Sequence, residues 1–210
     1  MTTATATTET TATEETEETE EITFKCGICG FSDSGDENEM METWTPLVWI
    51  MKGKEEVKPI DEPICPKCTE KCVFEDDDEP SMQLETYERI LRQVEIETEL
   101  AQFIGTEGYH KFSILSKLVL TDGVAYLCEK AGAFWLMDVI ASYQKQCQKD
   151  DMLRNSQVWT LTTKDGTGKV ICERDTNDIA ITQDIPYTDF PLDEIKLYCI
   201  NGVILLPSEN

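Results

Sequence analysis

The sequence CGICG at residues 26–30 and the sequence CPKC at residues 65–68 decide the fold of the first part of this 210-residue chain. Each contains two cysteines separated by two residues, so two thiolates of one tight turn can bind the same ion. Two such turns complete the tetrahedral four-thiolate shell of closed structural zinc sites. Gly30 permits the backbone conformation that ends the first turn, and Pro66 rigidifies the second. The pattern predicts metal ligands at Cys26, Cys29, Cys65 and Cys68.

Zinc is the metal that this ligand set favours, and iron is the alternative. The other interpretations of the cysteines are reduced thiols in a core or a dithiol redox pair. Cys72, four residues after the second pair, is either a substitute ligand or a free thiol, and we favour the free thiol. The apolar residues from Trp44 to Ile50 can supply a strand between the two pairs.

The cysteine segment resembles a zinc ribbon and also resembles rubredoxin, a small iron–tetrathiolate electron carrier. The second likeness lies in FKCGICGFSDSGDENE at residues 24–39 and DEPICPKC at residues 61–68. It implies that the same four cysteines would be iron ligands. The sequence departs from rubredoxin at Thr69, where a glycine is expected, and at Pro63-Ile64, where an aromatic residue is expected. These departures favour zinc over iron.

The charge of the chain is strongly negative and uneven. The net charge is −24, of which residues 1–100 carry −19 and residues 101–210 carry −5. Such a chain repels nucleic acid, because affinity for a duplex comes largely from Lys and Arg beside phosphates. It is attracted to basic surfaces, including one that normally holds nucleic acid. We therefore expect a protein partner, with a basic protein as one option, and no direct nucleic-acid binding.

Composition and periodicity divide the chain into four segments. Residues 1–21 form a Thr/Glu-rich tail expected to be disordered, and residues 22–74 form the four-cysteine module. Residues 75–104 begin with the acidic run 75–79 and continue as an amphipathic helix for which Ser81 is a candidate N-cap. Residues 105–210 place helices before strands, with Asp122 as a helix cap and hairpin turns at Asp165-Gly166-Thr167-Gly168 and Asn201-Gly202.

The predicted fold class is therefore α+β: a small four-cysteine metal knuckle module followed by an antiparallel-sheet domain with packed helices. Residues 105–208 resemble an uncharacterised domain of cyanobacterial, other bacterial and phage proteins. The resemblance lies in GYHK at 108–111, TDGVAYLCEKAGAFWLMDVIASYQ from 121, QVWTL from 157, YTDFPLDEIKLY from 187 and GVILLPSE from 202. It implies a compact α+β fold and a bacterial or phage source, and it implies no activity.

No set of catalytic residues stands out in the sequence, and we expect a protein that is not an enzyme. The best enzymatic alternative pairs His110, the one histidine, with Asp138, a carboxylate on an apolar helical stretch where burial would perturb its pKa. No apolar run reaches the roughly 18 residues that span a bilayer. Without an export signal or a membrane span, the expected location is the cytoplasm.

Together these features predict an acidic, intracellular, zinc-stabilised interaction protein that acts as an adaptor or inhibitor. One alternative function is electron transfer through a rubredoxin-like iron site. Another is nucleic-acid mimicry, in which the acidic first half occupies a basic groove of a host protein.

Overall fold

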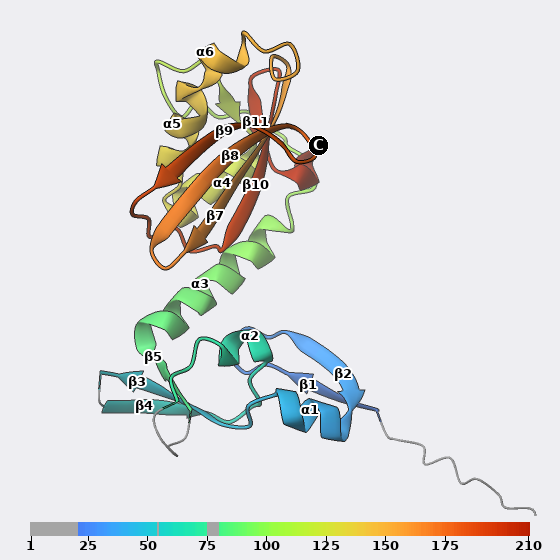
Figure 1. Cartoon of the computed structure of the whole chain (residues 1–210), viewed down its shortest axis with the longest axis vertical. Helices are drawn as coiled ribbons and strands as arrows, with labels where there is room; N and C mark the ends of the chain where they lie inside the picture. Colours follow the sequence, from blue (N-terminus) through green and yellow to red (C-terminus); the bar gives the residue numbers. More distant parts are fainter. Residues whose placement is uncertain (1–20, 54, 75–79) are drawn as a thin grey trace, which may run out of the picture. The chain divides into compact units, whose positions relative to one another are not determined.

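The computed structural model describes residues 21–53, 55–74 and 80–210. They belong to two compact units, Met1–Met82 and Gln83–Asn210. The tail expected over residues 1–21 lies outside the described residues except for Glu21, and so does the acidic run 75–79. Figure 1 shows the two units, each of which is described by itself below.

The described part of the first unit contains two small sheets and two short helices. Its elements are β1 (Glu21–Lys25), β2 (Ser32–Asp36), α1 (Glu37–Thr43), β3 (Val48–Lys52), β4 (Glu55–Ile60), α2 (Pro66–Thr69) and β5 (Ser81–Gln83). Strands β1 and β2 form an antiparallel hairpin, and the second sheet has the order β4-β3-β5. Strand β3 confirms the strand predicted between the cysteine pairs, because Val48 and Ile50 are buried while Trp49 and Met51 are partly exposed.

The core of the first unit is small and includes the cysteines themselves. Trp44 is 4% exposed and packs its ring against Phe24 at a centroid distance of 5.6 Å and against Phe31 at 6.3 Å. Ser81 is not a helix cap. It lies in β5, where its backbone exchanges two hydrogen bonds with Val73, and helix α3 begins three residues later. The capping prediction failed because a polar residue before a helical pattern can equally end a strand.

The second unit consists of four helices and one six-stranded sheet. Its helices are α3 (Leu84–Leu100), α4 (Asp122–Ala131), α5 (Phe134–Ser142) and α6 (Gln144–Cys147), with a final 3₁₀ turn η1 (Pro207–Glu209). Its strands are β6 (Val119–Leu120), β7 (Ser156–Lys164), β8 (Thr167–Asp175), β9 (Asp178–Ile185), β10 (Glu194–Ile200) and β11 (Val203–Leu205). The sheet order is β6-β11-β10-β7-β8-β9, antiparallel throughout except for the β11–β6 pair.

Two-residue turns fix the register of this sheet, as the sequence predicts. Asp165 and Gly166 join β7 to β8 with φ angles of 50° and 73°, and Asn201 and Gly202 join β10 to β11 with 52° and 86°. Positive φ at both central residues is the conformation whose twist matches that of a hairpin. Both predicted hairpins are confirmed.

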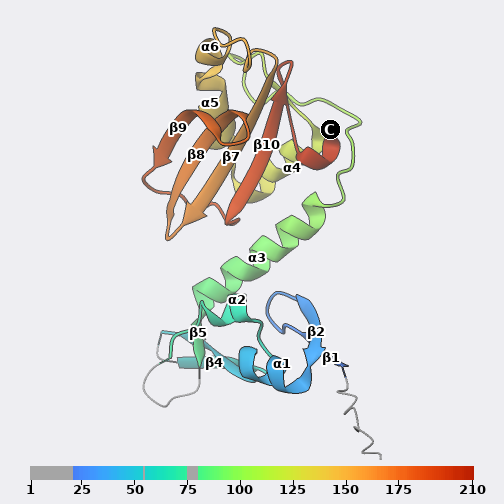
Figure 2. The same cartoon turned by 45° about the vertical axis from the view of Figure 1, so that its right-hand side comes forward.

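The core of the second unit lies between the sheet and its helices. Trp159, Leu161, Val170 and Leu197 point inward from β7, β8 and β10 and are each at most 1% exposed. They share one cluster with buried residues of α4 and α5, and Figures 1 and 2 show both helices on the same face of the sheet. The predicted α+β fold with an antiparallel sheet and packed helices is confirmed. None of the helices in the described part of the chain is both long enough and apolar enough to cross a membrane.

The C-terminal turn holds the start of α4 in place. One carboxylate oxygen of Glu209 accepts a hydrogen bond from the Gly123 N–H at 2.9 Å, and the other accepts from the Thr121 hydroxyl and the Leu206 N–H. A Cβ on Gly123 would lie 2.5 Å from Leu206, so the helix and the turn are in direct contact. A residue 86 positions away therefore satisfies one of the free N–H groups at the start of this helix.

Candidate metal centre

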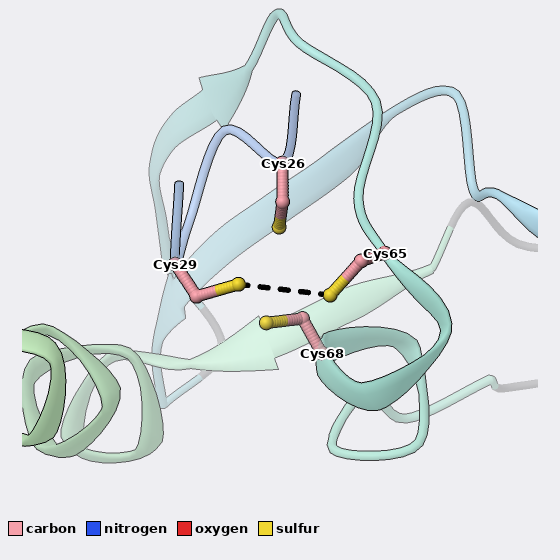
Figure 3. Close-up of side chains that lie close together, drawn as sticks. All are labelled: Cys26, Cys29, Cys65 and Cys68. Atoms are coloured by element: carbon pink, nitrogen blue, oxygen red, sulfur yellow. Dashed lines mark hydrogen bonds between the residues drawn. The ribbon is translucent and has the colours of Figure 1, made fainter. Parts of the chain in front are cut away.

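The sulfur atoms of Cys26, Cys29, Cys65 and Cys68 all lie within 4.8 Å of one another. Figure 3 shows the four side chains pointing toward a common centre from two separate segments of the chain. The Sγ atoms of Cys29 and Cys65 are 3.6 Å apart, and all four cysteines are free thiols, not disulfides. Four sulfurs at about 2.3 Å from a tetrahedral ion would be about 3.8 Å apart. The cluster is therefore close to the size that a metal ion needs.

The first cysteine pair lies in the tight turn that joins β1 to β2. The Cys26 N–H donates to the Phe31 carbonyl at 2.7 Å, and the Gly30 N–H donates to the Cys26 carbonyl at 2.9 Å. Gly30 has a φ of 71°, which explains the glycine at this position. A Cβ on Gly27 would lie 2.6 Å from Ile60 Cγ2, so the turn packs directly on the chain that leads to the second pair.

The second cysteine pair starts the single helical turn α2. Pro66 occupies the first helical position, where its missing N–H has no cost, and the N–H groups of Cys68 and Thr69 donate to the Cys65 carbonyl. Thr69 also ties this turn to the chain before β3. Its hydroxyl is 2.9 Å from that of Thr45, and the backbones of Thr45 and Ile64 exchange two hydrogen bonds.

Burial and hydrogen bonding separate the thiols into those that ionise easily and those that resist it. Cys26, Cys65 and Cys68 are at most 3% exposed, and Cys29 is partly exposed. A hydrogen bond from Cys68, helped by backbone N–H groups, lowers the pKa of Cys26 to about 4. The same bond raises the pKa of Cys68, and burial raises the pKa of Cys65 to about 11. A bound cation would lower the pKa of these thiols, because cysteine binds a metal as the thiolate.

The other cysteines lie outside the cluster. The Cys72 thiol donates to the Cys68 carbonyl at 3.6 Å, and burial raises its pKa to about 11. Cys128, Cys147, Cys172 and Cys199 are at most 2% exposed in the core of the second unit. Burial also raises the pKa of Cys128 and of Cys199 to about 12, which keeps these two thiols neutral.

The predicted pairing of His110 with Asp138 is wrong. Asp138 is exposed on α5, because it lies with Phe134 and Ser142 on the solvent side of that helix. The Nε2 atom of His110 lies 2.6 Å from Oδ1 of Asp122. The other oxygen of Asp122 accepts from the N–H groups of Glu107 and Gly108 and from the Thr106 hydroxyl. Asp122 is the first residue of α4, not its cap, and its carboxylate holds the 106–110 segment.

The sequence contains one signal for this contact, the acidic residue that precedes an apolar helical pattern. This pattern predicts a cap at Asp122, but the preceding Thr121 is the cap in the structure. The backbone bridge between His110 and Leu120 brings the histidine beside the start of α4. That pairing depends on a two-residue strand, which periodicity does not reveal.

Metal binding should release at least two protons per ion at pH 7.5, because the raised pKa values keep Cys65 and Cys68 protonated before the metal binds. Affinity for zinc should fall as the pH falls. Calorimetric titration of the reduced, metal-free chain with zinc in buffers of different ionisation enthalpy counts the protons. The Cys72→Ser variant is the matched control and should bind with the same stoichiometry, whereas release of fewer than two protons would contradict this site.

The Asp122 carboxylate should make the second unit sensitive to acid. Its hydrogen bonds from His110 and the 106–108 segment lower the pKa of Asp122 in the folded state. Below about pH 4 the unfolded chain therefore takes up a proton that the folded chain resists, and stability falls as the pH falls. Hydrogen exchange measures the free energy of opening of the α4 amides. This free energy should be lower in Asp122→Asn than in wild type at pH 6, and the difference should shrink toward pH 3. A difference that stays constant from pH 6 to pH 3 would refute the assignment.

Comparison with known proteins concerns the second unit. The model of a family described as "Family of unknown function (DUF6876)" matches residues 94–210. The match begins inside α3, eleven residues before the start suggested by the sequence, because Ile96 and Leu100 of that helix belong to the core of this unit. No curated protein and no solved structure matches the chain. The four cysteines of the cluster precede the matched range. The match covers more than half of the chain, and the chain belongs to this family of unknown function.

Proposed function

We propose that the first unit is a zinc-stabilised module that binds a basic surface of a partner protein. The observation that carries the proposal is the closed four-sulfur cluster directly beside an exposed acidic segment. A tetrahedral ion with four cysteine ligands has no open position for water or substrate, so such an ion contributes to the fold and not to hydrolysis. Zinc is favoured over iron by the sequence differences from rubredoxin at Thr69 and Ile64.

The size of the first unit supports a structural role for the metal. Its described part contains about sixty residues, a length at which an apolar core alone gives marginal stability. The buried residues Val48, Ile50 and Ile64 lie in small strands and bridges on the side of the second cysteine pair. An ion would link them to the β1–β2 hairpin, and its binding energy would become folding energy.

Residues 31–43, here called the acidic segment, form the surface that we assign to the partner. They comprise β2 and α1, contain five acidic residues and contain no Lys, Arg or His. Phe31 and Met41 are exposed by 52% and 65% among these carboxylates. The side chain of Asp36 accepts from the Asn38 N–H and caps α1, which keeps the segment ordered.

The composition of the acidic segment defines the chemistry of its partner. Carboxylates around two exposed apolar side chains fit a surface that combines Lys or Arg with an apolar patch. The hydrogen bond between Cys26 and Phe31 attaches the segment to the first cysteine turn. Loss of the metal would therefore loosen the surface that the partner contacts.

Electron transfer is a second candidate, because four thiolates also bind iron in rubredoxin-like sites. Cys29 is the partly exposed ligand, and electrons would enter or leave through such a position. An iron site of this kind is coloured and undergoes reversible reduction, whereas a zinc site is colourless. The visible spectrum of protein purified from its native source separates the two candidates.

Reversing charge in the acidic segment should weaken affinity for a basic probe. The probe is a fluorescein-labelled dodecapeptide of four Lys-Arg-Leu repeats, and fluorescence anisotropy measures its binding to the zinc-loaded chain. The triple variant Glu37→Lys, Glu39→Lys, Glu42→Lys should bind about tenfold more weakly, from about 0.2–1 kcal/mol per exposed ion pair. Raising the salt concentration from 50 to 300 mM should weaken wild-type binding in the same direction.

The matched control makes the same change of charge on the second unit. Glu107, Glu129 and Glu194 are exposed there, and their replacement by lysine should leave at least half of the affinity. Equal losses in both triple variants would mean that net charge alone attracts the probe, and the proposal would fail. If duplex DNA displaced the probe, this would show only that DNA competes with the chain for the peptide. Tight binding of the chain to a basic DNA-binding protein, reversed by added DNA, would favour nucleic-acid mimicry.

A further inference from the structure

A second surface, of opposite charge, lies in the second unit. It is a groove of about 1240 Å³ between the 113–118 segment, the exposed side of α5 and α6, and the turn that joins β10 to β11. Its cationic lining residues are Lys117, Lys145, Lys149 and Arg154, and its acidic lining residue is Asp138. Residues 101–210 contain ten basic and fifteen acidic side chains. Four of these ten cations therefore gather in one groove with one of the fifteen acids.

These cations are available to a ligand. Lys117, Lys145 and Lys149 are exposed, and within the described ranges none of them has a carboxylate oxygen within 4.0 Å. Arg154 is paired with Asp151 on its outer side. Positive charge that lines a concave surface raises the local potential, because the low-dielectric walls focus the field. The groove is thus a site for negative charge on a chain that is otherwise strongly negative.

The floor of the groove is polar and rigid. Gln157 is 2% exposed, and its side-chain amide exchanges two hydrogen bonds of 3.0 Å with that of Gln144. The oxygen of Gln157 also accepts from the Trp159 indole at 2.9 Å, which fixes the orientation of the amide. The backbone of Asn201 donates to the Asn155 carbonyl and closes the end of the groove. Because these amides already satisfy one another and their neighbours, recognition of a ligand depends on the cations and on the rim of the groove.

The rim of the groove carries exposed apolar side chains. Ile114 is fully exposed and Leu115, a lining residue, is 97% exposed. Their loop has local order, since the Ser113 hydroxyl accepts from the Leu115 N–H and the Ser116 hydroxyl accepts from the Leu118 N–H. Two large aliphatic side chains presented to water beside a basic groove mark a contact surface.

We propose that this groove binds an acidic peptide segment of a partner protein, with its carboxylates on the lysines and an apolar side chain on Leu115 and Ile114. The site is separate from the acidic segment of the first unit and binds a ligand of opposite charge. The adaptor function would then join two partners, one basic and one acidic. The ligand must therefore carry carboxylates that match the lysines. It must also carry an apolar side chain that packs on the exposed aliphatic pair.

Other anionic ligands fit the groove less well. Single-stranded nucleic acid binds through aromatic stacking, and the lining of this groove contains no aromatic side chain. A bilayer surface is flat and would contact the rim of this concave groove more than its lining. A small anion would leave most of about 1240 Å³ empty and would not use the aliphatic rim.

Fluorescence anisotropy with an acidic amphipathic probe tests the proposal. The probe is a fluorescein-labelled dodecapeptide of four Glu-Asp-Leu repeats, and a second peptide replaces each leucine by serine at the same charge. The full chain should bind the leucine peptide at 50 mM salt at least fivefold more tightly than the serine peptide. The double variant Lys145→Glu, Lys149→Glu should weaken binding at least tenfold, and Leu115→Ser should remove the preference for leucine.

The double variant Lys164→Glu, Lys196→Glu is the control, because both lysines are exposed on the second unit and neither lines the groove. It should keep at least half of the affinity. Equal weakening in the two double variants, or absence of binding at 50 mM salt, would overturn the proposal. So would Leu115-dependent binding to phosphatidylserine vesicles that exceeds binding to the peptide, since the loop would then be a membrane contact. The basic Lys-Arg-Leu probe is expected to be unaffected by Lys145→Glu, Lys149→Glu, which separates this proposal from the one above.

Discussion

Four sulfurs of the first unit converge on one point. Cys29 and Cys65 are 36 residues apart in the sequence, and their Sγ atoms are 3.6 Å apart. Buried neutral thiols gain little free energy from lying close together. A cation that replaces their protons would stabilise the cluster and so explain the arrangement.

The second unit relies on a different kind of constraint. Its sheet and helices share one apolar core, and long-range polar contacts fix the start of α4. Glu209 accepts a hydrogen bond from the Gly123 N–H of that helix, and Asp122 binds the loop that precedes it. These contacts require no metal. The two units therefore have separate sources of stability, and their surfaces have opposite local charge: an acidic segment in the first and a basic groove in the second.

Much of the fold follows from short sequence patterns. The spacing of the cysteines predicts the cluster, and Asp165-Gly166 and Asn201-Gly202 predict the hairpins, because each is a local pattern with a specific backbone geometry. The carboxylate that contacts His110 could not be predicted in this way, since it depends on a bridge between residues 110 and 120. Apolar neighbours of Asp138 suggested burial, but the helix turns that residue outward. Lys117, Lys145 and Arg154 are scattered in the sequence, and only the tertiary structure gathers them in one groove.

The central claim is that the four cysteines bind one structural zinc ion. X-ray absorption at the zinc edge, on untagged protein with about one zinc per chain, tests it most directly. The account predicts four sulfur neighbours at about 2.3 Å, with no nitrogen or oxygen in the coordination shell. Nitrogen or oxygen neighbours, fewer than four sulfurs, or a protein purified from its native source with iron in place of zinc would contradict it.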